Sequence, residues 1–169
     1  PYIKKKFSKP GERSFFYIGR YGSFDDEKGV RLLENLAAMV PGFRGGYICP
    51  DGEIKGWHRI SRPTSLTRGF MERIAAGYDI FINMSRADAQ ATTVLEAMSW
   101  GFPVACTRET GYTDDALFHL DLENEAHNLD TIKQIQEMSS RDLETMVDDN
   151  RKALSAKYSW NTFIEQLVS

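Results

Sequence analysis

The amino-acid sequence predicts an α/β fold in which helices flank a parallel β-sheet. The main observation is the stretch 85–104, which lies between two short apolar runs at residues 78–82 and 103–106. Runs of this length are typical of buried strands. Apolar residues recur at helical spacing between them, and Gly101 stands where a left-handed residue commonly ends a helix. A strand, a helix and a strand in this order form a parallel crossover unit.

Length and charge narrow the classes of function. The chain has 169 residues, of which 41% are hydrophobic, so it is long enough for one domain with a sizeable core. Its net charge of −3 argues against a nucleic-acid partner, which would need a basic excess. No apolar run reaches transmembrane length, and we expect a cytoplasmic protein. The three lysines at residues 4–6 leave peripheral contact with the inner face of a membrane as an alternative, but we expect them to be solvated, because a short run of lysines usually is.

The two cysteines, Cys49 and Cys106, each end an apolar run and have no Cys or His partner at metal-ligand spacing. They are therefore predicted to be buried free thiols in a reducing compartment. We expect neither a metal nor a cofactor.

The chain is next taken from its start. Residues 1–13 are polar and basic, and they are expected to form a linker or N-terminal arm ahead of a domain at residues 14–169. The apolar run 14–18 predicts a buried strand. Apolar residues then recur at helical spacing from residue 29 to residue 40, where Pro41 stops the predicted helix.

The middle of the chain is less regular. Residues 43–49 predict a strand, in which two adjacent glycines indicate a bulge or a close backbone approach. Residues 53–60 alternate weakly and predict an edge strand or a hairpin partner. Residues 63–65 are expected to cap a helix at 66–76, which leads to the central unit.

After the central unit, the pattern becomes mostly helical. Residues 116–120 predict a last strand. Helices are predicted at residues 130–138, 141–158 and 160–168, and serines precede the second and third of them as caps.

Charged side chains follow the strands of the predicted sheet. Arg20 and Lys28 flank the loop after the first strand, and Asp88 and Glu96 follow the strand at 78–82. Because the carboxyl ends of parallel strands meet at one edge, we expect these side chains to face one crevice, together with the loop 107–114. Cations near helix N-termini and a carboxylate suited to hydroxyl pairs indicate a site for a phosphate attached to a sugar.

Each of these residues also has a structural interpretation. Arg20 and Lys28 could be solvated loop cations. Ser85 and Asp88 have the spacing of a helix capping box, which would make Asp88 structural. Glu96 could be a solvated helix residue.

The stretch 85–104 resembles the signature of family 4 glycosyltransferases, which are retaining enzymes of the GT-B fold. It has an acidic residue, seven residues, then Glu-Ala-Met and a Gly-x-Pro-Val ending. The segments 17–20 and 27–30 resemble the first strand and helix of the family's C-terminal domain, and 158–160 resembles its closing helix. The resemblance covers residues 15–167. It implies a single Rossmann-like domain, the donor-binding half of an enzyme whose N-terminal acceptor domain is missing.

The resemblance also implies roles for particular residues. Arg20 and Lys28 would hold the diphosphate of a nucleotide-sugar donor and assist catalysis, and Asp88 would approach the donor sugar. The amides of Ala91 and Thr92 would face phosphate, and Glu96 would bind the ribose hydroxyls. The enzyme would act in glycan biosynthesis as a hexosyltransferase-like protein, and this domain alone is expected to be inactive.

The sequence departs from the family pattern at the sugar side of the site. Asp88 replaces the usual first glutamate, and Ala89 and Ala91 stand where glycines are common. Two other functions therefore stay open. One is a non-catalytic module that binds a nucleotide or a phosphosugar, and the other is a nucleotide-sugar epimerase-like domain.

Overall fold

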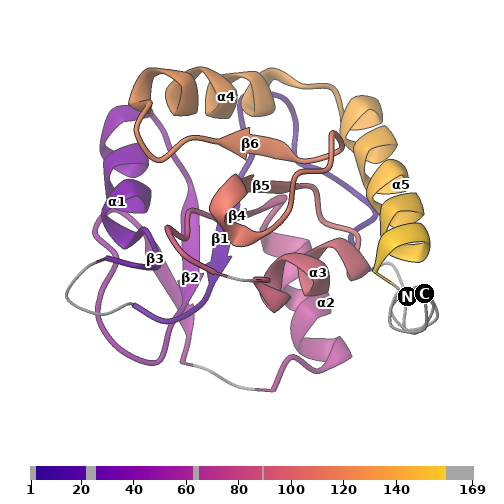
Figure 1. Cartoon of the computed structure of the whole chain (residues 1–169), viewed down its shortest axis with the longest axis horizontal. Coiled ribbons are helices and arrows are strands. Elements are labelled where there is room, and N and C mark those ends of the chain that lie inside the picture. Colours follow the sequence, from indigo (N-terminus) through magenta and orange to yellow (C-terminus); the bar gives the residue numbers. More distant parts are fainter. Residues whose placement is uncertain (1–2, 22–25, 63–64, 89, 159–169) are drawn as a thin grey trace, which may run out of the picture.

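The computed structural model describes residues 3–21, 26–62, 65–88 and 90–158. They form one six-stranded sheet in the order β3-β2-β1-β4-β5-β6, and every neighbouring pair of strands is parallel (Figure 1). The strands are β1 (Phe15–Ile18), β2 (Gly45–Ile48), β3 (His58–Ser61), β4 (Ile80–Asn83), β5 (Val104–Thr107) and β6 (Phe118–Leu120). The predicted parallel α/β sheet is therefore confirmed.

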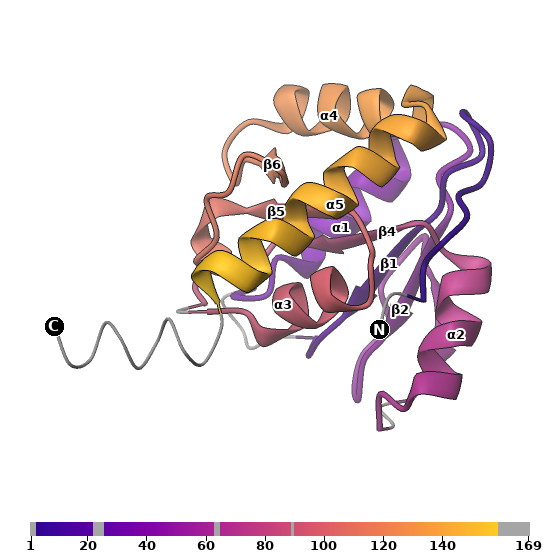
Figure 2. The same ribbon diagram turned by 90° about the vertical axis from the view of Figure 1, so that its right-hand side faces the viewer.

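Helices cover both faces of the sheet (Figure 2). They are α1 (Val30–Met39), α2 (Arg68–Gly77), α3 (Thr92–Ser99), α4 (Glu125–Glu137) and α5 (Ser140–Lys157), and a short 3-10 turn, η1 (Arg108–Thr110), follows β5.

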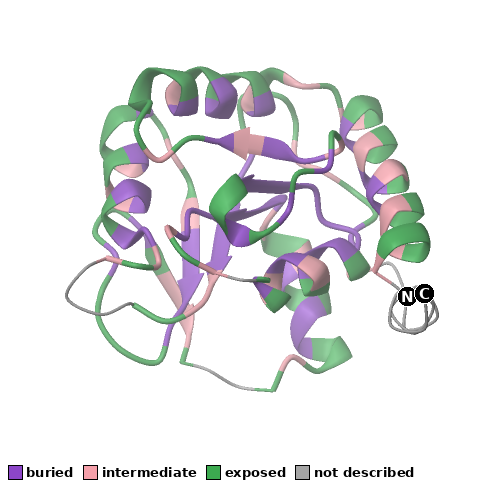
Figure 3. Cartoon of the chain, in the orientation of Figure 1, coloured by how far each residue is buried: buried purple, intermediate pink, exposed green. Residues whose placement is uncertain are grey.

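The core has two halves because successive residues of a strand point to opposite faces of the sheet. Phe15 and Tyr17 pack with α1 and α4 on one face, whereas Phe16 packs with α2 and α3 on the other. The central strands β4 and β5 are buried along their whole length (Figure 3). Because both faces of these strands are buried, their sequences are mostly apolar instead of alternating between apolar and polar residues.

Several predicted boundaries need correction. The α2 helix starts at Arg68 behind a Thr67 cap, so residues 63–65 do not cap it. The α4 helix starts five residues earlier than predicted, because the Asn124 side chain accepts a hydrogen bond from the His127 amide. Strand β3 runs parallel to β2, which excludes the hairpin alternative. The helix predicted at 160–168 lies outside the described residues.

Other expectations are confirmed. Gly101 has the left-handed φ of 85° that the end of α3 requires. The backbone approaches closely at the two glycines of β2, since a Cβ on Gly46 would lie 2.3 Å from the Tyr78 hydroxyl oxygen. Both cysteines are buried free thiols. Among the described residues, none of the helices combines the length and the apolar character that a membrane crossing needs.

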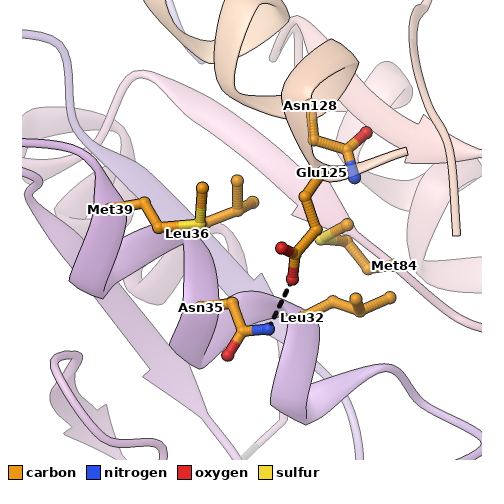
Figure 4. A pocket seen from close by; sticks show the side chains of 7 residues that line it. All are labelled: Leu32, Asn35, Leu36, Met39, Met84, Glu125 and Asn128. Atoms are coloured by element: carbon orange, nitrogen blue, oxygen red, sulfur yellow. Dashed lines mark hydrogen bonds between the residues drawn. The ribbon is translucent and has the colours of Figure 1, made fainter. Parts of the chain in front are cut away.

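Helices α1 and α4 meet over the end of β4. The Asn35 amide donates a hydrogen bond of 2.8 Å to the Glu125 carboxylate across the two helices (Figure 4). Beneath this bond lies a cavity of about 10 Å³, which Met84 helps to line. A cavity of this size holds at most one water, so the contact serves packing rather than ligand binding.

Candidate functional site

The candidate site lies at the carboxyl ends of β1, β4 and β5. Strand β1 pairs with β2 on one side and with β4 on the other, so the sheet changes its direction of growth between β1 and β4. In open parallel sheets this switch point is where ligands bind. The described parts of the loops that reach it are residues 19–21 and 26–29 after β1 and residues 84–88 and 90–91 after β4, and η1 lies beside them.

The loop 84–91 is held from both sides. The Ser85 hydroxyl and the Arg86 amide both donate to the Glu27 carbonyl, at 3.0 and 2.7 Å. On the other side, the Asp88 amide donates to the Glu109 carbonyl at 3.0 Å. These bonds fix the backbone of the loop between the loop after β1 and the η1 turn.

Gly29 allows the first of these contacts. Its φ is 65°, and a Cβ at this position would lie 1.9 Å from the Met84 carbonyl oxygen. Only glycine combines the left-handed backbone with this close approach. The start of α1 can therefore lie directly against the end of β4.

The structure brings two of the predicted site residues together. The Lys28 ammonium lies 2.8 Å from the Asp88 carboxylate, and the two side chains are 28% and 26% exposed. A pair with this exposure is screened by water and contributes at most about 1 kcal/mol to stability. Both side chains therefore remain accessible to a ligand that offers a stronger interaction.

The capping-box interpretation of Ser85 and Asp88 is excluded. Helix α3 begins at Thr92 behind Ala91, and the Ser85 hydroxyl is bonded to Glu27 instead of to a helix amide. Asp88 thus lies in the loop ahead of the helix, where its side chain meets Lys28.

The N-terminus of α3 points at the same edge of the sheet. The Ala91 amide, expected to face phosphate, donates instead to the Thr110 carbonyl at 3.1 Å. The amides of Thr92 and Thr93 have no backbone or side-chain acceptor among the described residues, and Ala91 supplies no side-chain cap. Two donors without an acceptor in the described part of the chain, together with the helix dipole, therefore favour an anion here.

Glu96 and Arg20 make fewer contacts. Glu96 is the fifth residue of α3 and is exposed, on the side of the helix away from the buried Val94 and Met98. Partial burial of its carboxyl still raises its pKa. Arg20 is exposed, and its carbonyl accepts a hydrogen bond from the Tyr17 hydroxyl at 2.8 Å. Neither side chain contacts the Lys28–Asp88 pair in the described part of the chain.

Sequence reasoning missed the residues that support the loop. The buried Thr107 hydroxyl donates to the Ser85 carbonyl at 2.6 Å, and the buried Thr110 hydroxyl donates to the Thr107 carbonyl. Thr107 ends β5 and Thr110 ends η1, and no spacing pattern in the sequence indicates that their hydroxyls form these bonds. Within the described residues, no three His, Cys, Asp or Glu side chains gather as a metal would require.

This sheet order, with helices on both faces, is that of a Rossmann-like nucleotide-binding domain. No family model matches the sequence, and no curated protein matches it in sequence either. Similarity therefore comes from solved structures alone.

Those structures are glycosyltransferases. TarM matches 95% of this chain with a TM-score of 0.72 and 15% identity, and sucrose-phosphate synthase from Thermosynechococcus elongatus matches 94% with a TM-score of 0.68 and 14% identity. The C-terminal domain of the group 1 glycosyltransferase LpcC from Francisella tularensis matches 90%, with a TM-score of 0.64 and 14% identity. The chain has the fold of the C-terminal domain of GT-B glycosyltransferases.

The extent of each match fits one domain of a larger architecture. The chain spans 35% of TarM and 44% of sucrose-phosphate synthase, but 89% of the isolated LpcC domain. At these sequence identities the structural similarity establishes the fold. The reaction depends on the residues of the site.

Proposed function

We propose that the chain is the donor-binding domain of a retaining glycosyltransferase, which transfers a sugar from a nucleotide-diphosphate sugar to an acceptor. The observation that carries the proposal is the meeting of Lys28 and Asp88 at the switch point, at the edge of the sheet where α3 begins. One cation, one carboxylate and an open helix N-terminus are the groups that a sugar diphosphate requires.

The diphosphate would lie between Lys28 and the amides of Thr92 and Thr93. Its charge would draw Lys28 from Asp88, because charge-assisted hydrogen bonds to phosphate are stronger than a half-exposed ion pair. Arg20, on the same loop as Lys28, is exposed and could turn to the same anion. Glu96, one turn further along α3, would accept hydrogen bonds from the ribose hydroxyls.

The reaction would be a substitution at the anomeric carbon. The bond from this carbon to the diphosphate oxygen breaks, and the acceptor hydroxyl oxygen bonds to the same face of the sugar. The proton of the hydroxyl passes to the leaving phosphate. Negative charge grows on the diphosphate during this step, so Lys28 would stabilise the transition state more than the ground state.

The proposal is tested by nucleotide binding. A thermal-shift screen of UDP, GDP and ADP identifies the preferred diphosphate, since a ligand that binds only the folded state raises the melting temperature. Calorimetry with that ligand is then repeated on Lys28→Ala. Loss of one charge-assisted bond should weaken binding at least about tenfold.

Lys133→Ala is the matched control, because Lys133 is an exposed lysine on α4, remote from the site. Its affinity should equal that of the unaltered chain. If Lys28→Ala and Lys133→Ala bind the diphosphate equally well, the site assignment is wrong.

A non-catalytic binding module is the second candidate. It is favoured by Asp88, whose shorter carboxylate is engaged with Lys28 instead of being free for a sugar. A nucleotide-sugar donor that binds but is neither hydrolysed nor transferred by the full-length protein would support the module over the enzyme.

A further inference from the structure

The N-terminal arm, residues 3–14, is part of the folded domain. It runs beside the amino ends of the strands, on the right-hand side of Figure 2. The expectation that its lysines are solvated is wrong for Lys4, which is only 6% exposed. Arg13, at the other end of the arm, is 1% exposed.

Lys4 joins the two ends of the segment that carries the candidate site. That segment starts at Asp79, continues through β4, the loop 84–91 and α3, and ends at Trp100. The Lys4 ammonium lies 3.0 Å from the Asp79 carboxylate. The Lys4 amide donates to the Trp100 carbonyl at 3.2 Å.

The Lys4 ammonium contacts the Asp79 carboxylate and the Ala75 carbonyl, and Asp79 has further hydrogen-bond partners. Asp79 is 1% exposed and accepts hydrogen bonds from the Ser8 amide at 2.9 Å and from the Ser14 amide at 3.1 Å. Burial raises its pKa, but the Ser8 amide and the Lys4 charge outweigh this effect and hold the pKa below its usual value. The Lys4 ammonium also donates to the Ala75 carbonyl in the last turn of α2 at 2.8 Å, where a cation is favourable.

We propose that Lys4 and Asp79 are positioning residues for the donor site, an inference that rests on the proposed function. Their ion pair fixes residue 4 against the start of β4, and the main-chain amide of the same residue holds the end of α3 at the amino edge of the sheet. The loop 84–91 and the free amides of α3 lie at the other end of this strand–loop–helix segment, one helix length of about 12 Å away. Without the buried pair, α3 can tilt about its C-terminal end, and its amides leave the diphosphate.

The other end of the arm supplies a matched control. The Arg13 guanidinium donates to the Met138 carbonyl at 2.9 Å and to the Ser8 carbonyl, so it ties the arm to the junction of α4 and α5. Arg13 is as buried and as cationic as Lys4, but within the described residues it makes no hydrogen bond or ion pair with α3. Its loss should lower stability without moving the donor amides.

The test compares Lys4→Met, Asp79→Asn and Arg13→Met. Melting temperature and calorimetric affinity for the preferred nucleoside diphosphate are measured for each, at a temperature where all are folded. We expect all three variants to melt earlier. Only Lys4→Met and Asp79→Asn should bind the diphosphate more weakly, by roughly threefold to thirtyfold. Asp79→Asn keeps the shape and the acceptor oxygen of the side chain, so it provides the measurement if Lys4→Met does not fold.

Each other outcome overturns the inference. Unchanged affinity in Lys4→Met or Asp79→Asn, with a lower melting temperature, would make the pair merely structural. Equal weakening in Arg13→Met would make the effect one of general destabilisation. If the unaltered chain binds no nucleoside diphosphate, the proposed function itself fails and this inference fails with it.

Discussion

At the scale of single residues, the proposed function depends on a competition for Lys28. Asp88 holds the Lys28 ammonium at 2.8 Å, at the carboxyl ends of β1 and β4. The same carboxylate would oppose an incoming diphosphate by charge repulsion. On the proposed function, Asp88 would therefore order the lysine and at the same time limit the affinity for the bare nucleoside diphosphate.

Asp88→Asn should tighten binding of the nucleoside diphosphate, because Lys28 no longer needs to be drawn from a negative partner. A half-exposed pair of this kind contributes at most about 1 kcal/mol, so the gain should be roughly twofold to fivefold at low salt. Calorimetry measures it. Glu53→Gln, which removes an exposed carboxylate from the loop after β2, is the control and should leave the affinity unchanged. Weaker binding by Asp88→Asn would mean that Asp88 itself holds the nucleotide.

The sequence placed Lys28 and Asp88 at one edge of the predicted sheet, but it did not show that they pair. Asp88 and Lys28 are sixty positions apart, and their contact depends on the backbone bonds that clamp the loop 84–91. The spacing of Ser85 and Asp88 also fits a helix cap, because side-chain spacing alone does not show where α3 begins. The start of the helix at Thr92 decided between the two interpretations.

At the scale of elements, the close approach of α1 to the end of β4 shapes the site. Gly29 lies between them, and the bonds from Ser85 and Arg86 to Glu27 follow from this approach. Any group that separates the two elements would also separate Lys28 from Asp88.

Gly29→Ala should therefore destabilise the protein more than its backbone strain alone would. A non-glycine residue in the left-handed region costs about 1–2 kcal/mol, and overpacking adds about 1–3 kcal/mol. Gly42→Ala isolates the first contribution, since Gly42 has a φ of 71° and a Cβ there meets no atom within 4 Å. Urea unfolding should show the larger loss for Gly29→Ala. Equal losses would contradict the close approach.

Element types were easier to predict than element ends. The central strands could be predicted because both of their faces are buried and their apolar runs are unbroken. The start of α4 was missed because its first turn, Glu125 to Asn128, is mostly polar and exposed, and its cap is a single asparagine side chain.

At the scale of the whole molecule, the sheet order brings together parts of the chain that are far apart in sequence, and the arm is joined to the sheet through the buried Lys4. The parallel sheet followed from the alternation of strands and helices along the sequence. The contact of the arm with the sheet could not be predicted in this way. Lys4 pairs with Asp79, seventy-five positions away, and a run of lysines usually indicates solvent exposure.

On the proposed function, a nucleoside diphosphate binds at the carboxyl ends of β1 and β4. Backbone hydrogen exchange, measured with and without saturating diphosphate, shows where the ligand binds. We expect added protection at residues 26–29 and at the start of α3, including Thr92 and Thr93. Protection confined to the opposite edge of the sheet, at the hollow of about 380 Å³ lined by Arg44, His58 and Tyr78, would contradict it.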